Sequence, residues 1–131
     1  MPTRHERPRE RGTAAVEFAL VLPLVLVVVL GLVQVGLIAR DRLLVEAAAR
    51  AGARAAALDP DPAAVAAAAA TAAPGLDVSA LLVTTERPGG RGDPVTVNVV
   101  YEDPVRVPLV SWLVGDVVAL HAAAVARQEF G

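Results

Sequence analysis

Glu17 is the residue whose type and position most need a chemical explanation. It follows Gly12 by five residues and stands near the start of an apolar run, residues 13–39, whose other polar side chains are Thr13 and Gln34. A carboxylate close to hydrocarbon is costly, by several kcal/mol, unless it is neutralised or paired. Glu17 must therefore either pair with a positive group or snorkel to the lipid headgroups, and its type and position alone leave both interpretations open.

Other residue types that could perform chemistry lack a supporting pattern. Ser111, Asp116 and His121 are the types used in nucleophilic catalysis, but no nucleophile-elbow motif surrounds them. His5 and His121 are the two histidines, and without cysteine there is no metal-ligand spacing. Arg91-Gly92-Asp93 is an integrin-type tripeptide that a glycine-rich turn generates by chance. We expect a protein that is not an enzyme and holds no cofactor or metal.

Composition indicates a membrane protein with a small second part. The 131 residues are 55% hydrophobic and leave room for one membrane helix and one domain with a modest core. The net charge is −2, yet residues 1–12 carry four arginines and two glutamates. Because the net positive charge is local to this leader, it predicts a topology signal and no nucleic-acid partner.

The leader and the apolar run predict the topology. Residues 1–12 are expected to be a disordered basic leader in the cytoplasm. Residues 13–39 would form a helix about 40 Å long, enough to cross the ~30 Å hydrocarbon layer of a membrane. The arginines before this helix place the N-terminus inside, so residues 40–131 are expected outside the inner (cytoplasmic) membrane of a single-pass protein. Gln34 is expected to hydrogen-bond at the interface or to another helix.

Residues 40–131 predict a small extracytoplasmic α+β domain. The helix should continue over 40–58 with an amphipathic pattern and end at the prolines that follow. The alanine-rich stretch 62–73 predicts a short helix capped by Asp61. Alternation over 80–86 and 95–102 predicts an antiparallel hairpin. Residues 117–127 suit either helix or strand. We favour strand, because two strands alone are marginally stable, so the antiparallel sheet has two or three strands.

The N-terminal segment resembles a known family. Arg11-Gly12 followed by Thr13-Ala14-Ala15-Val16-Glu17-Phe18-Ala19-Leu20-Val21-Leu22-Pro23 is similar to the N-terminus of TadE-like proteins. These are pseudopilin-like, or minor-pilin, components of the tight-adherence (Flp-type) pilus secretion system. Ala49-Arg50-Ala51-Gly52-Ala53-Arg54-Ala55-Ala56 also resembles the segment that follows the membrane helix in that family.

The resemblance implies a processed, non-enzymatic pilus-assembly subunit. A prepilin peptidase would cut after Gly12, and Thr13 would become the new N-terminal ammonium. That ammonium, in the same or a neighbouring subunit, could pair with Glu17, so assembly pairing is assigned to Glu17 and Phe18. The partners implied are the peptidase, other pilin-like subunits and membrane lipid. The alternative is a secreted soluble binding protein whose signal peptide is cleaved near residues 51–53, although the apolar run exceeds the length of an ordinary signal.

Overall fold

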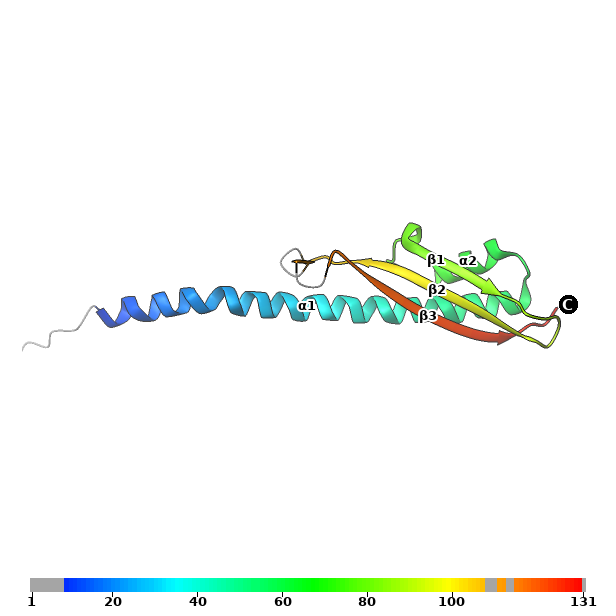
Figure 1. Ribbon diagram of the computed structural model, residues 1–131, viewed down its shortest axis with the longest axis horizontal. Helices are drawn as coiled ribbons and strands as arrows, with labels where there is room; N and C mark the ends of the chain where they lie inside the picture. The colour runs from blue at the N-terminus through cyan, green and yellow to red at the C-terminus, as the bar shows by residue number, and fades with distance from the viewer. Residues whose placement is uncertain (1–8, 108–110, 113–114, 131) are drawn as a thin grey trace, which may run out of the picture.

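A single long helix links the apolar N-terminal run to the rest of the fold. The computed structural model describes residues 9–107, 111–112 and 115–130. Helix α1 (Arg9–Leu58) is continuous over 50 residues, and its N-terminal part projects far beyond everything else (Figure 1). We refer to α2, the sheet and the part of α1 that they cover as the head.

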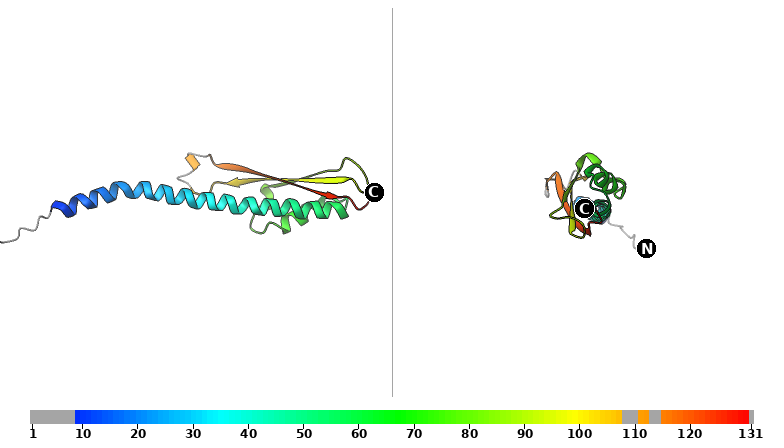
Figure 2. Two further views of the ribbon diagram at one scale, coloured as in Figure 1. Left: turned by 90° about the horizontal axis from the view of Figure 1, so that it is seen from below. Right: turned by 90° about the vertical axis from the view of Figure 1, so that its right-hand side faces the viewer.

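Helix α1 begins earlier than the sequence predicts. The expected disordered leader spans residues 1–12, yet residues 9–12 are helical, while residues 1–8 lie outside the described part. Arginine and glutamate have good helix propensity, and a turn added to an existing helix needs no new nucleus. The helix also passes through Pro23, which lacks a backbone donor, and it curves gently along its apolar part (Figure 2).

The remaining elements form the α+β head that the sequence predicts. Helix α2 (Pro62–Thr71) starts at Asp61, whose Oδ1 accepts a hydrogen bond from Ala63 N at 2.9 Å. A short 3₁₀ turn, η1 (Val78–Ala80), leads into strand β1 (Leu81–Glu86). Strands β2 (Pro94–Pro104) and β3 (Val117–Arg127) complete the sheet.

The sheet is a three-stranded antiparallel meander in the order β1-β2-β3. In its register Val97 of the central strand lies opposite Thr85 on one side and Ala124 on the other. Residues 117–127 are therefore a strand, the alternative that we favoured, and they pair with the whole length of β2. This pairing gives β2 a partner on both edges.

The core lies between α1, α2 and one face of the sheet. Alternate residues of β2 are fully buried there, which confirms the predicted period of two. The helices contribute mostly alanine side chains to this core, so the helix backbones lie close to the sheet. A Cβ on Gly52 of α1 would lie 3.0 Å from Val97 Cγ1. The buried cluster comprises Val45, Ala48, Ala49, Ala53, Ala56, Ala57, Val65, Ala69, Ala73, Leu76, Val95, Val97, Val99, Tyr101 and Leu120.

The C-terminal end of α1 is tied to the sheet by groups that satisfy its free carbonyls. Arg87, just after β1, donates from Nη1 to Ala56 O at 2.6 Å and from Nη2 to Asp59 O at 2.9 Å. Glu129 N donates to Ala57 O at 2.8 Å. The last carbonyls of a helix have no partner within the helix, so these donors fix where α1 ends against the head.

Candidate functional site: the uncovered helix and its junction with the head

The N-terminal part of α1 is not covered by the head. Every residue from 12 to 29 is exposed, and the most apolar window of the helix has a mean hydropathy of 2.8 with none of it buried. A core helix of a soluble protein would be mostly buried. We call residues 12–33 the uncovered helix. The exposed large side chains of this segment are Val16, Phe18, Leu20, Val21, Leu22, Leu24, Val25, Leu26, Val27, Val28, Val29, Leu32 and Val33.

The length of the uncovered helix matches a membrane. Helix α1 is long and apolar enough to cross one, which suggests a single-pass membrane protein. Thr13 to Val33 is 21 residues, and at about 1.5 Å per residue this is roughly 30 Å, the thickness of the hydrocarbon layer. The head begins where that length ends.

The predicted site residues all lie on the uncovered helix. Gly12 has nothing within 4 Å of the position of a Cβ. Thr13 and Glu17 are exposed and stand one turn apart on the same side of α1. Phe18 is 66% exposed. Thr13 and Glu17 therefore lie on one helix face, and Phe18, next to Glu17 in the chain, is also exposed.

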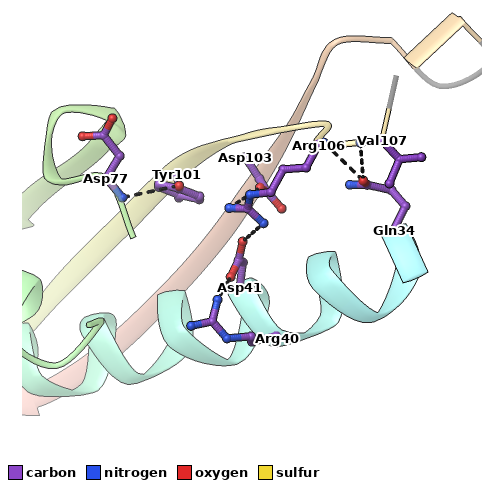
Figure 3. Close-up of polar contacts among 8 residues, drawn as sticks. All are labelled: Gln34, Arg40, Asp41, Asp77, Tyr101, Asp103, Arg106 and Val107. Carbon is purple, nitrogen blue, oxygen red and sulfur yellow. Dashed lines mark hydrogen bonds and ion pairs between the residues drawn. The ribbon is translucent and has the colours of Figure 1, made fainter. Parts of the chain in front are cut away.

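The junction between the uncovered helix and the head starts at Gln34. Its side chain is only 2% exposed, and its Oε1 accepts hydrogen bonds from the backbone nitrogens of Arg106 at 3.2 Å and Val107 at 3.1 Å (Figure 3). The sequence led us to expect an interfacial or helix–helix hydrogen bond. The partner is instead the chain that leaves β2, because the head covers α1 from this turn onward.

Two turns further along α1, two buried carboxylates and the partly exposed side chain of Arg106 form an ion-pair cluster that joins the helix to the sheet. Arg106 Nη1 lies 2.8 Å from Asp41 Oδ2, and Arg106 Nη2 lies 3.4 Å from Asp103 Oδ1 (Figure 3). The Asp41 and Asp103 residues are 0% and 1% exposed. Arg40, mostly exposed, adds a contact of 3.0 Å to Asp41 Oδ1. One guanidinium thus serves two buried carboxylates from different elements.

This sharing leaves Asp103 short of compensation. Burial raises the pKa of Asp103 above its usual value, and the negative charge of Asp41 raises it further, while Arg106 opposes both effects. The guanidinium of Arg106 in turn has its pKa raised, first by its hydrogen bond to Asp41. The cluster therefore holds the head on α1, but keeping Asp103 ionised inside it is unfavourable.

The sequence contained a signal for this junction that we did not use. Gln34 and Asp41 are seven residues apart, and both lie on the line of small and apolar residues that continues through Val45, Ala48 and Gly52. Such spacing puts them on the buried face of a helix. Asp103 and Arg106 carried no comparable local signal, because their partner is some sixty residues away in the chain.

The residue types considered for catalysis do not assemble. Asp116 and His121 are five residues apart along extended chain, so their Cα atoms are separated by about 16 Å. Both are exposed, and His121 borders a shallow surface with Glu46 and Arg50. Within the described residues no group of three or more histidines or acids is placed to hold a metal ion.

Comparison with known proteins gives one match. No match is found among the curated proteins or among the solved structures. The family model described as TadE-like protein matches residues 12–54, which include the uncovered helix, Gln34, Asp41 and the first turns beneath the sheet. The chain is thus consistent with a TadE-like protein, by a match confined to its long N-terminal helix.

Proposed function

We propose that this protein is a membrane-anchored subunit of pilus assembly, processed after Gly12 and associating with pilin-like subunits through the uncovered helix. The observation that carries the proposal is the uncovered helix itself, which is apolar apart from Thr13 and Glu17, of membrane length and within the TadE-like match. The apolar side chains of such a helix can be covered by lipid or by the apolar faces of other helices. The head, packed on the same helix, would then be held just outside the membrane.

The position of the head sharpens the expected span. Residues 13–39 were expected to cross the membrane, but Gln34 is already under the head. We therefore place the hydrocarbon span at Thr13–Val33, with the basic leader inside and the head outside. Single-cysteine variants test this orientation, because the chain has no cysteine of its own. In intact cells that lack the prepilin peptidase, so that the leader is retained, Thr3→Cys should resist a membrane-impermeant maleimide and Arg91→Cys should react; the reverse result would refute the orientation.

Cleavage after Gly12 is supported by the local helix. Gly12 and Thr13 lie in the first turns of α1, where few hydrogen bonds hold the backbone. Glycine lowers helix stability by about 1 kcal/mol relative to alanine, so opening the scissile bond costs little. Mass spectrometry of the protein made with and without a prepilin peptidase should find Thr13 at the N-terminus only with it. Gly12→Leu should block this processing, and Gly36→Leu, also on an exposed part of α1, should not.

Glu17 is proposed to pair with the ammonium that cleavage creates. Side chains on an α-helix lean toward its N-terminus, so the carboxylate of Glu17 leans toward Thr13, one turn before it. The positive end of the helix dipole also favours a carboxylate near this end of the helix. Within the described residues Glu17 has no ion-pair partner, which leaves it available to Thr13 of its own or a neighbouring chain. Phe18 would pack beside it against the neighbouring helix.

The assembly role has a direct test. Glu17→Val should leave the protein in the membrane fraction but reduce its co-purification with pilin-like subunits several-fold. Val16→Leu, at the adjacent exposed position, serves as the control and should co-purify normally. Normal recovery of partners by the Glu17→Val variant would remove the pairing role while leaving the membrane anchor intact.

The secreted alternative is weakened by the place at which it must be cut. Gly52 and Ala53 are buried in the covered part of α1. Cleavage there would remove Val45, Ala48 and Ala49 from the core of the head. A domain of this size has little core to spare, so the remaining sheet would lose the helix on which it packs.

A further inference from the structure

The described residues between β2 and β3, which are 105–107, 111–112 and 115–116, lie at the end of the head from which the uncovered helix emerges (Figures 1 and 2). The base of this segment is closed by a hydrogen bond from Val105 N to Asp116 O at 2.9 Å. It is attached to α1 by the two backbone hydrogen bonds to Gln34. The level of Arg106 and Val107 along the axis of α1 is therefore set by Gln34, the first residue after the proposed membrane span.

This segment carries Trp112, the sole tryptophan of the chain, and it is 76% exposed. Next to it in the chain, Ser111 O accepts a hydrogen bond from Gly115 N at 2.8 Å. Tryptophan is strongly buried on average in water-soluble folds. Its large ring with one polar N–H is instead well suited to the boundary between hydrocarbon and water, where tryptophan is enriched in membrane proteins.

The charges around the junction fit the same boundary. Arg40 lies six residues beyond Gln34, about 9 Å further along the helix, and its side chain is 57% exposed. That distance places a guanidinium at the depth of the lipid headgroups when Val33 marks the end of the hydrocarbon. Trp112 and Arg40 thus sit at the levels expected of an aromatic and a cationic interfacial anchor.

We infer that Trp112 inserts into the headgroup region of the bilayer and gives the head a second attachment to the membrane. The inference rests on the proposed membrane span. A single helix alone would let the head tilt freely with it, whereas a second contact to one side of α1 fixes both its tilt and the side of the head that faces lipid. The partner of Trp112 is lipid, because Trp112 belongs to the end of the head from which the uncovered helix emerges.

Tryptophan fluorescence tests the inference on the full chain. The protein is reconstituted into phosphatidylcholine–phosphatidylglycerol vesicles and first floated on a density gradient. Phospholipids brominated near the headgroup end of their chains should then quench the emission at least about twofold more than lipids brominated near the chain ends. Quenching by aqueous iodide should fall several-fold below that of N-acetyltryptophanamide. All emission is assignable, because the chain has one tryptophan.

A relocated tryptophan provides the control. In the double variant Trp112→Phe, Val125→Trp the reporter is on β3, at an exposed position opposite Thr96 near the far end of the sheet. It should be quenched freely by iodide and not by brominated lipid. If Trp112 itself behaves in this way, the inference is wrong. Protection from iodide without any lipid quenching would mean that protein covers Trp112, and would also overturn it.

Failure of the membrane span is recognised separately. A chain that does not float with the vesicles would contradict the proposed anchor itself. Flotation without lipid quenching of Trp112 would leave the anchor standing and remove only the second attachment. As a further check, Trp112→Ser should float normally but increase the mobility of a spin label attached at Arg91→Cys; unchanged mobility would count against a role in fixing the head.

Discussion

Arg106, which directly follows β2, reaches across to Asp41 of α1, with Nη1 2.8 Å from Oδ2. The same guanidinium faces Asp103 at 3.4 Å. Removing one partner of a buried pair leaves the other charges without compensation. This side chain therefore holds together two carboxylates that would otherwise repel each other inside the head.

Replacing Arg106 should loosen the head strongly. Arg106→Met keeps much of the aliphatic packing but strands Asp41 and Asp103, so the free energy of unfolding of the head should fall by about 2–4 kcal/mol. Hydrogen exchange of the β2 amides in the micelle-bound protein measures this loss. Arg91→Met, on the exposed β1–β2 loop, is the matched control. Equal protection in both variants would show that the cluster contributes nothing.

Asp103 should make the stability of the head depend on pH. Its pKa is raised in the folded state, chiefly by burial and then by Asp41. The folded protein therefore binds this proton more tightly than the unfolded chain, and the stabilisation is present at low pH and lost as the pH rises through the folded pKa. Asp103→Asn should remove this dependence and, at pH 7, raise the free energy of unfolding.

Thermal unfolding of the two proteins at several pH values checks that prediction. The difference between Asp103→Asn and the parent should be largest at pH 7–8 and should shrink as the pH falls toward the folded pKa. Comparison at each pH cancels the contribution of other carboxylates, such as Asp77, whose pKa is lowered by hydrogen bonds from Ser79. A difference that grows on acidification would have the wrong sign and would refute the assignment.

Gln34 should control the segment that follows β2. Gln34→Leu removes the acceptor of two backbone N–H groups, and each unmade hydrogen bond to a buried donor costs about 1–3 kcal/mol. The amides of Arg106 and Val107 should then exchange at least about tenfold faster, while the amides of Val97 and Val99 stay protected. Val33→Leu, one residue earlier on an exposed side, should change neither set. Unchanged exchange in Gln34→Leu would mean that other contacts hold the segment.

Two glycines of α1 should respond oppositely to substitution. A Cβ at Gly52 would meet Val97 Cγ1 at 3.0 Å, whereas nothing lies within 4 Å of that position at Gly36. Gly52→Leu should destabilise the head by about 1–3 kcal/mol through overpacking. Gly36→Ala should be neutral or stabilise α1 by up to about 1 kcal/mol through helix propensity. Thermal unfolding of both variants measures the contrast, and a stable Gly52→Leu variant would show that α1 and β2 can separate at little cost.

The local patterns of the sequence predicted the fold well. Alternation from Val95 to Tyr101 identified the central strand, since a period of two has no other structural source at that length. The prolines after Leu58 ended α1, because residues before proline leave the helical region. The third strand needed a tertiary argument, as Ala122 to Ala124 favour helix by propensity. Pairing with β2 overrode that preference.

The junction was harder to predict because its parts are distant in sequence. Nothing near Asp103 indicates that Asp41 is its neighbour, and nothing near Arg106 indicates Gln34. Hydropathy also did not separate the residues before Gln34, which are uncovered, from those after it, which the head covers. An apolar helix that faces lipid and one that faces a protein core have similar compositions, so both parts appeared as one run over 13–39. The buried stripe that begins at Gln34 separates them. Gly12, Thr13, Glu17 and Phe18 remain predictions that only processing and partner experiments test.

The continuity of α1 has a mechanical consequence. No loop or hinge separates the segment that would pack among neighbouring helices from the segment on which the sheet is built. Each residue of an α-helix turns by about 100°, so a shift of one residue in how the uncovered helix meets its neighbours would swing the whole sheet by that angle. Contacts made within the membrane would thus determine which face of the head is turned toward its neighbours outside.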